Sequence, residues 1–207
     1  MNIPGPAGSL EAWLERPAGA TASPTRVAVL CHPHPLYGGN MHDGVLDAVA
    51  RALLGADIAC LRFNFRGVGA SAGSHSGGPG ERLDLGAAID WVQGELTPQS
   101  LWLAGYSFGS SVVWDYLVAG ASTPSIEHAF LIAPPTAAMA FPQGAPGCPA
   151  DAIAGGADHF VDAAKLATLE SVTAHVLPGA DHFFSGQHRA FADTLREVIF
   201  RRAEPRR

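Results

Sequence analysis

The chain has 207 residues, 47% of them hydrophobic, and a formal net charge of -6 from 13 Lys and Arg against 19 Asp and Glu. This length and composition predict one domain over residues 1–207, and the acidic balance argues against nucleic acid or an anionic membrane as partner. Since no apolar run approaches the roughly 20 residues that span a bilayer, we expect a soluble cytoplasmic protein.

Short apolar runs recur along the chain and predict the strands of a sheet. Most of them are almost continuously hydrophobic, which is typical of strands covered on both faces. In chain order they are RVAVLC (26–31), IACLRF (58–63), SLWLAG (100–105), HAFLIA (128–133), DAIAGG (151–156) and TAHVLPG (173–179).

Helical patterns alternate with these runs. Apolar residues spaced by three and four positions predict helices over 42–56, 81–96, 110–120, 160–170 and 189–202. The alternation predicts an α/β fold, a mostly parallel twisted sheet with helices on both faces in a three-layer sandwich. The segment GSLEAWLER (8–16) predicts a further, antiparallel strand at an edge.

The motif GYSFG (105–109) joins a predicted strand to a predicted helix. Gly105 and Gly109 lack a Cβ, so the turn between them can be tight and Ser107 can lie exposed at its apex. This context favours a nucleophilic serine. The alternative is a serine that merely begins a helix after a glycine-rich loop.

A nucleophilic serine needs a base and an acid that orients the base. With such a turn they are expected in later loops, the acid first and the histidine second. Asp158 and His182 satisfy that order, and His182 is the one of nine histidines that lies in a suitable loop. Asp181 is a rival acid but adjoins His182 in the chain, and Asp162 is better placed to cap a helix.

Acyl transfer also requires N–H donors for the oxyanion of its intermediate. One expected donor is the N–H of Phe108, the residue after the nucleophile. Another is expected in the loop after the predicted strand over 26–31. In that loop Pro33 and Pro35 have no N–H. We therefore expect His34 as the second donor, with Leu36 in reserve.

These residues resemble the α/β-hydrolase superfamily, and specifically its small, lidless branch of dienelactone-hydrolase-like hydrolases. The resemblance runs from about residue 26 to 200 and rests on CHPHPLYGGNM, RFNFRGVGASAG, GYSFG, GGAD and DHFF. His32 to Pro35 line up with a His-Gly-x-Pro form in which x is the donor position. Pro33 departs from the usual glycine, which leaves the second donor open.

Many members of this superfamily insert a helical cap after the sixth strand. Here only residues 134–149 separate two predicted strands, so we expect no cap domain and an open, shallow cleft that suits small acyl groups. Apolar loop residues that could line the cleft are Leu36, Tyr37, Met139, Phe141, Phe183 and Phe184.

Other motifs favour weaker interpretations. His32 and His34 form an H-x-H pair, but the sequence lacks the further ligands typical of a zinc hydrolase, and GVGASA (67–72) satisfies a dinucleotide motif without a helix to follow it. We expect neither metal nor cofactor.

Arg66 with Glu81 and Asp84 predicts either a buried ion pair or a group that binds a substrate carboxylate. Three cysteines outside any CxxC pair are expected to be buried free thiols: Cys31, Cys60 and Cys148.

The sequence thus predicts a serine hydrolase that cleaves small carboxylic esters through an acyl-enzyme, with Ser107, His182 and Asp158 as its catalytic residues. Its expected partner is a small-molecule ester. Thioester or lactone hydrolysis is the alternative within this class, and a non-catalytic binding module on the same fold is the alternative outside it. The oligomeric state stays open, with a homodimer as one option.

Overall fold

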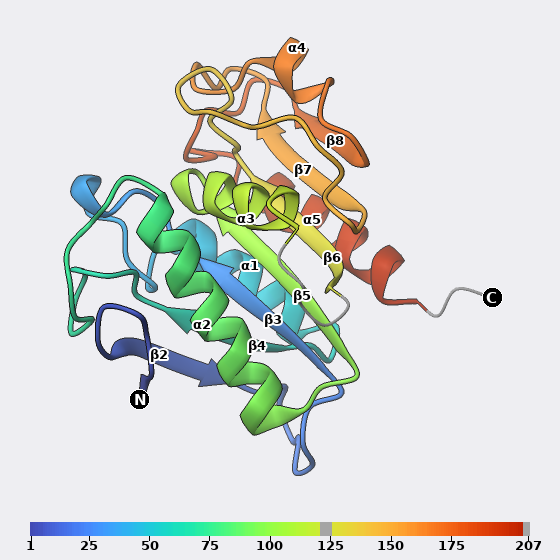
Figure 1. Ribbon diagram of the computed structural model, residues 1–207. Helices are drawn as coiled ribbons and strands as arrows, with labels where there is room; N and C mark the ends of the chain where they lie inside the picture. The colour runs from blue at the N-terminus through green and yellow to red at the C-terminus, as the bar shows by residue number, and fades with distance from the viewer. Residues whose placement is uncertain (121–125, 205–207) are drawn as a thin grey trace.

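The computed structural model describes residues 1–120 and 126–204 (Figure 1). In this part of the chain eight strands form one sheet in the order β1-β2-β4-β3-β5-β6-β7-β8. Along this order, all neighbours in the stretch β4-β3-β5-β6-β7-β8 pair in parallel. By contrast, β2 pairs antiparallel with β4, and β1 pairs antiparallel with β2. The predicted strand over 8–16 is therefore confirmed as antiparallel, but the short β1, not β2, is the outermost strand.

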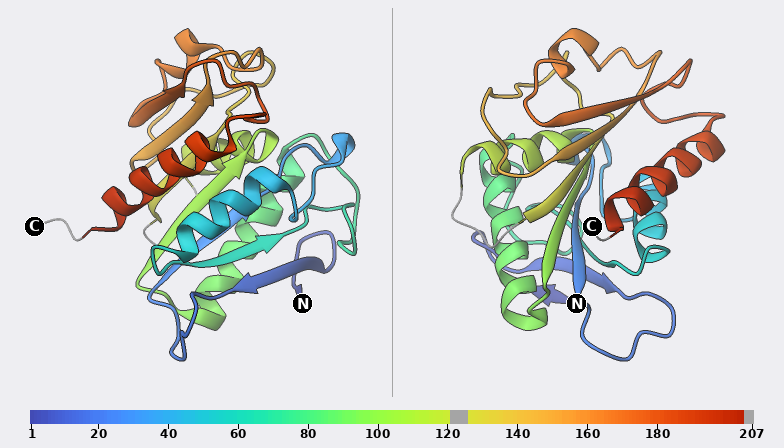
Figure 2. Two further views of the ribbon diagram at one scale, coloured as in Figure 1. Left: turned by 180° about the vertical axis from the view of Figure 1, so that it is seen from behind. Right: turned by 90° about the vertical axis from the view of Figure 1, so that its right-hand side faces the viewer.

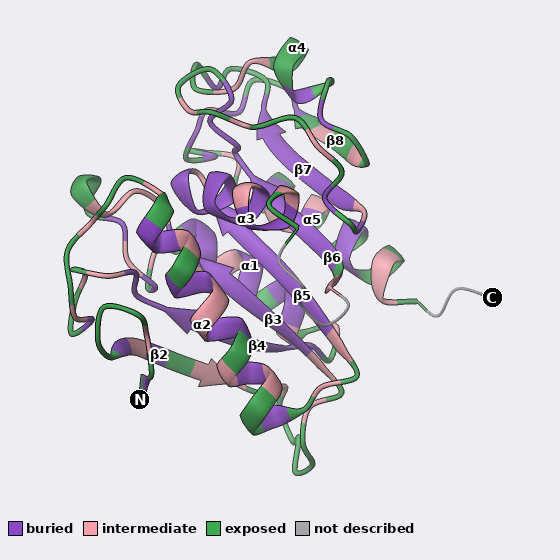
Figure 3. Ribbon diagram, viewed as in Figure 1, coloured by how far each residue is buried: buried purple, intermediate pink, exposed green. Residues whose placement is uncertain are grey.

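The strands match the predicted apolar runs closely. They are β2 (Leu10–Glu15), β3 (Arg26–Cys31), β4 (Ala59–Phe63), β5 (Ser100–Tyr106), β6 (Ile126–Ile132), β7 (Ala150–Gly155) and β8 (Val172–Leu177). One strand was not predicted, β1 (Asn2–Ile3), because two residues carry no readable periodicity. Figure 3 shows the central strands buried, while β2 and β8 near the edges include exposed residues.

Four helices of the prediction are present at nearly their expected positions: α1 (Gly44–Leu54), α2 (Pro79–Leu96), α3 (Phe108–Val118) and α5 (His188–Ala203). A 3-10 turn, η1 (Pro35–Tyr37), follows β3. The helix predicted over 160–170 is mostly wrong, since α4 covers only Ala163–Leu166. Its expected first turn is held as a loop, because Thr136 bonds through its hydroxyl to both the N–H and the C=O of Asp162.

The molecule has three layers. Helices α2 and α3 cover one face of the sheet, and α1 and α5 cover the other (Figure 2). Each face has its own apolar core, for example around Leu85 and Val113 beneath α2 and α3, and around Leu46 and Leu195 beneath α1 and α5. The predicted α/β fold class is confirmed. The three cysteines are free and buried, as the sequence predicted.

The connection between β6 and β7 explains why the top of the sheet is open. Residues 133–149 form turns and irregular backbone, and no helix or strand interrupts them. The predicted absence of a cap domain therefore holds for this connection. Among the helices of residues 1–120 and 126–204, none is both long enough and apolar enough to cross a membrane.

Candidate active site

Ser107 lies at a sharp turn between β5 and α3. Its φ of 53° and ψ of −118° are unusual for a residue other than glycine, and its N–H donates to Ile132 O at 2.8 Å. A Cβ on Gly105 would collide with Gly109 O, and one on Gly109 would collide with Cys31 O. The two glycines thus let the helix start against β3 and β5, which holds Ser107 in a strained, accessible conformation.

Three side chains from three different loops meet at this turn. His182 Nε2 lies 2.9 Å from Ser107 Oγ, and His182 Nδ1 lies 2.7 Å from Asp158 Oδ2. Asp158 and His182 are only 7% and 9% exposed, so solvent does not loosen the pair. Since β5, β7 and β8 are parallel, the loops at their carboxyl ends come together at one edge of the sheet. The structure therefore brings Ser107, His182 and Asp158 together.

The two rival acids have other roles. Asp181 Oδ1 accepts the N–H groups of Phe183 at 3.0 Å and Ser185 at 2.8 Å. Hydrogen bonds from Ser185, followed by that from Phe183, hold the pKa of Asp181 below its usual value. Asp162 caps α4 by accepting two backbone N–H groups. Each carboxylate stabilises a turn of its own.

The N–H of Phe108 is the first of α3 and points toward the cleft end of the helix, where the helix dipole favours negative charge. Within residues 1–120 and 126–204, neither this N–H nor that of His34 has a hydrogen-bond acceptor. Both residues line the cleft. The N–H of Leu36, the reserve donor, is already occupied, because it donates to His34 Nδ1 at 3.2 Å.

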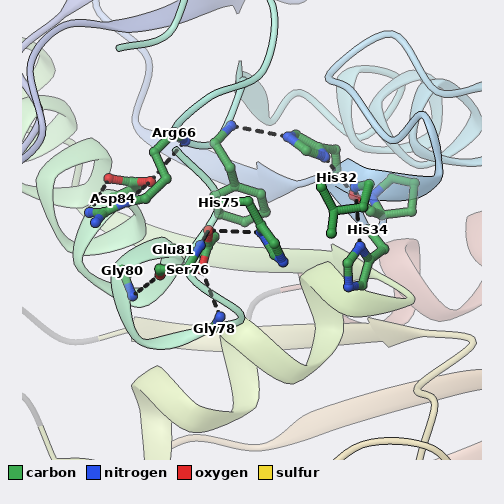
Figure 4. A network of polar contacts seen from close by, with 12 residues as sticks. His32, His34, Arg66, His75, Ser76, Gly78, Gly80, Glu81 and Asp84 are labelled. Carbon is green, nitrogen blue, oxygen red and sulfur yellow. Dashed lines mark hydrogen bonds and ion pairs between the residues drawn. The ribbon is translucent and has the colours of Figure 1, made fainter. Parts of the chain in front are cut away.

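His32 is buried beneath this loop and both of its ring nitrogens are used (Figure 4). Its Nδ1 lies 2.6 Å from Pro33 O, and its Nε2 accepts the N–H of Phe65 at 3.0 Å. Burial lowers the pKa of His32 to about 4, so the ring is neutral near pH 7. His32 therefore ties the loop after β3 to the end of β4, and its ring has no nitrogen left for a metal.

Arg66 forms an ion pair. Its Nε and Nη2 donate to the two oxygens of Asp84 at 3.0 and 2.8 Å, and its backbone N–H donates to the same carboxylate (Figure 4). Asp84 is fully buried on α2. Of the two interpretations left open by the sequence, the structure supports the ion pair, because the fork of the guanidinium is already occupied.

A second carboxylate on α2 supports the loop beside the nucleophile. Buried Glu81 accepts the N–H groups of Ser76 and Gly78 at 2.9 and 2.7 Å, and lies 3.0 Å from His75 Nδ1. The ring of His75 in turn packs against His34 and Phe108, with centroids 4.8 and 5.5 Å apart. His75, which lies in the loop that precedes α2, thus packs against both candidate oxyanion donors.

A cleft of roughly 750 Å³ opens above Ser107 and His182. Tyr37, Met139 and Phe183 line it, as the sequence predicted. The remaining lining residues are Pro33, His34, Gly38, Gly39, Asp43, Tyr106, Phe108, Pro135, Ala138 and Phe160.

Three residues predicted for the cleft lie elsewhere. Leu36, in η1, is 72% exposed and does not line the cleft, and Phe141 lines a separate hollow together with Lys165. Phe184 is fully buried and stacks on Phe191 with centroids 4.0 Å apart. An apolar side chain in a loop is as easily used to anchor the loop as to meet a ligand, and no local pattern separates the two cases.

Two further residues lie beside His182 although no sequence pattern predicts them there, Phe160 and Tyr106. Tyr106 precedes the nucleophile and donates through its hydroxyl to His182 O at 3.1 Å. Phe160 stands two residues after Asp158, and its ring lies 4.8 Å from that of His182. Its place two residues after the expected acid is the signal for such a contact, whereas the apolar spacing from Phe160 onward predicts a helix.

Comparisons with known proteins place this fold among the α/β serine hydrolases. A serine hydrolase without a lid from Xanthomonas campestris has 35% sequence identity and a TM-score of 0.88, covering 100% of this chain and 95% of that one. An α/β serine hydrolase homologue from Coxiella burnetii has 32% identity and a TM-score of 0.85, covering 96% and 95%. An uncharacterized protein of Rickettsia prowazekii, RP471, is 33% identical over 94% of this chain and 86% of its own length. No family model matches the chain.

Proposed function

The chain belongs to the α/β-hydrolase superfamily, and from that premise we propose that it hydrolyses small carboxylic esters with Ser107 as nucleophile, His182 as base and Asp158 as orienting acid. The observation that carries the proposal is the hydrogen-bonded series Asp158–His182–Ser107, with contacts of 2.7 and 2.9 Å, at the floor of an open cleft. The general activity of a hydrolase follows from the family; the ester substrate and these three roles are the proposal.

In the first half of the proposed reaction His182 Nε2 takes the proton of Ser107 Oγ while that oxygen attacks the ester carbonyl carbon. The carbonyl oxygen becomes negative and accepts hydrogen bonds from the N–H groups of Phe108 and His34. When the intermediate collapses, His182 gives its proton to the departing alcohol oxygen. The acyl group is then bonded to Ser107.

In the second half His182 takes a proton from water, and the resulting hydroxide oxygen bonds to the acyl carbon. The bond to Ser107 Oγ breaks as His182 returns the proton to that oxygen, and the acid is released. Asp158 contributes in both halves because its carboxylate fixes Nδ1–H of His182 and stabilises the imidazolium form. Every step uses groups of the chain and water.

The proposal is tested by measuring kcat/KM on matched esters, thioesters and lactones for the wild type and for Ser107→Ala. Loss of the nucleophile should lower ester turnover on the order of 10³-fold or more. Ser111→Ala is the matched control, since its α3 hydroxyl donates to Phe108 O and not to His182. A dominant rate on thioesters or lactones would move the substrate class, and wild-type-like turnover by Ser107→Ala would remove the nucleophile.

A further inference from the structure

The proposed reaction fixes where the departing alcohol must lie. His182 Nε2 protonates the alcohol oxygen, so this oxygen has to come within hydrogen-bond reach of that nitrogen at the moment of departure. The rest of the alcohol therefore occupies the part of the cleft that surrounds His182. This placement of the leaving group, and the chemistry inferred for it, rest on the proposed function.

Two phenylalanine rings lie next to His182 at this place. The ring of Phe160 lies 4.8 Å and that of Phe183 lies 5.4 Å from the imidazole, centroid to centroid. Both rings line the cleft that contains Ser107, yet they are 48% and 60% exposed. Large apolar side chains gathered at the mouth of a cleft indicate a surface that binds an apolar group.

The backbone of both phenylalanines is held in place. Phe160 donates its N–H to Asp158 Oδ1 at 2.8 Å, and its C=O accepts the N–H of Ala137 at 2.9 Å. Phe183 donates its N–H to Asp181 Oδ1 at 3.0 Å. Asp158 thus positions both the base and one of the rings beside it. A subsite built on a fixed backbone loses little conformational entropy when it binds its ligand.

We propose that Phe160 and Phe183 form a subsite for the alcohol part of the substrate and that this alcohol carries an aromatic ring. A ring entering beside His182 comes next to both phenyl groups, and aromatic pairs attract beyond their area burial at centroid separations of about 4.5–7 Å. The cleft has no cap over it. A flat, rigid group that contacts only two rings should therefore gain more binding free energy there than a long flexible chain, because the chain would lose rotational freedom without being covered.

The experiment varies the alcohol while the acyl group stays acetyl. The substrates are methyl, cyclohexylmethyl and benzyl acetate, and hydrolysis is measured as the release of acetic acid. For the wild type, kcat/KM on the benzyl ester should exceed that on the methyl ester about tenfold. It should exceed that on the cyclohexylmethyl ester by about threefold, since the saturated ring offers similar area without aromatic pairing.

Two variants and a matched control locate the effect. Phe183→Ala and Phe160→Ala should each lower the preference for benzyl over methyl by about threefold or more while the methyl ester changes less. Phe200→Ala is the control: Phe200 is 48% exposed, like Phe160, but lies on α5 away from the cleft. It should leave the preference unchanged.

Equal rates on methyl and benzyl esters would overturn the subsite, and equal rates on benzyl and cyclohexylmethyl esters would overturn its aromatic character. A uniform loss on all three esters in the phenylalanine variants would also count against it, because it indicates general damage to the loops. Failure of the proposed function has a different signature: the wild type would hydrolyse none of the esters, and Ser107 would not react with a fluorophosphonate.

Discussion

Two buried aspartates with histidine partners lie at opposite ends of the same part of the sheet. Asp158 and His182 follow β7 and β8 at their carboxyl ends, with 2.7 Å between carboxylate and Nδ1. Asp151 lies near the start of β7 and contacts Nε2 of His128 and of His175, also at 2.7 Å. By residue type and distance the two clusters are nearly equivalent.

They differ in what completes them. Arg202 on α5 donates to both oxygens of Asp151 at 2.8 and 3.1 Å, so the buried charge is neutralised within the fold. Burial raises the pKa of Asp151, but hydrogen bonds from His128, Arg202 and His175 outweigh burial and hold it well below the usual range.

At Asp158 the series ends instead on a strained serine in a cleft. A carboxylate–histidine pair is therefore not by itself the mark of catalysis. Under the proposed function, the third partner and the space above it distinguish the reactive cluster at Asp158 from the Asp151 cluster, which holds α5 against the sheet.

The largest expected effect is on activity at the cleft end. Asp158→Asn should lower kcat about 10⁴-fold, because an amide favours the wrong tautomer of His182. Asp181→Asn is the matched control, since that carboxylate stabilises a turn next to His182 without orienting its ring. Steady-state kinetics of both variants on one ester decides between them. A greater loss in Asp181→Asn would transfer the acid role to Asp181.

The reciprocal change at the other end should affect stability. Asp151→Asn leaves Arg202 without its charge partner, and we expect the free energy of unfolding to fall by about 3 kcal/mol. This loss is at the low end for buried ion pairs, because Arg202 is partly exposed. Ester turnover at 25 °C should stay within a few-fold of wild type. Urea unfolding gives the first quantity. Unchanged stability would mean that the cluster does not hold α5.

Exposed Asp193, which pairs with Arg196 on the same helix, is the control for Asp151. Asp193→Asn should lower the free energy of unfolding by less than about 1 kcal/mol.

The stabilisation from Asp151 should also depend on pH. Since the pKa of Asp151 is lowered in the folded protein, its contribution to the free energy of unfolding is complete above the ordinary aspartate pKa of ~3.9 and is lost as the pH falls below it.

A third prediction concerns His32, which supports the cleft end without belonging to either aspartate cluster. Its folded pKa of about 4 lies below the usual 6.5, so the unfolded chain binds more protons between these values. The free energy of unfolding should therefore fall by about 2–3 kcal/mol as the pH decreases through this window. Urea unfolding at several pH values in wild type and His32→Asn checks it. Equal pH slopes in the two proteins would contradict a buried neutral His32.

The smallest expected effect is on acyl-chain preference. Each buried CH₂ contributes about 0.8 kcal/mol only where a wall covers it, and residues 133–149 offer no helix to cover the cleft. Turnover of p-nitrophenyl esters should therefore peak at roughly two to six acyl carbons, without a rise in rate above the solubility limit. A maximum at much longer chains would show that a loop closes over the site.

The sequence could predict the cluster of Asp158, His182 and Ser107, here called the cleft cluster, but not the cluster around Asp151. Strand order and a glycine-flanked serine direct attention to Asp158 and His182, because parallel strands bring the loops at their ends together. The residues around Asp151 are separated by about twenty positions or more and meet only through the register of β6, β7 and β8 and the docking of α5. No local periodicity encodes that register.

The motif DHFF shows the same limit within four residues. Asp181 closes a turn, His182 contacts Ser107, Phe183 faces the cleft and Phe184 is buried against α5. The sequence indicates the histidine, since this loop is where a base is expected after such a serine turn. It cannot separate the roles of the two phenylalanines, because a positive φ of 55° at Phe184 turns the chain and sends that ring into the core.

The central claim, that the cleft cluster activates Ser107 whereas the Asp151 cluster only stabilises the fold, is tested most directly by fluorophosphonate labelling followed by mass mapping of the modified peptide. We predict one adduct on Ser107, formed by the wild type and by Asp151→Asn at similar rates, formed far more slowly by Asp158→Asn, and absent in Ser107→Ala. An adduct on another residue, or labelling of Ser107 that is as fast in Asp158→Asn as in the wild type, would contradict the claim.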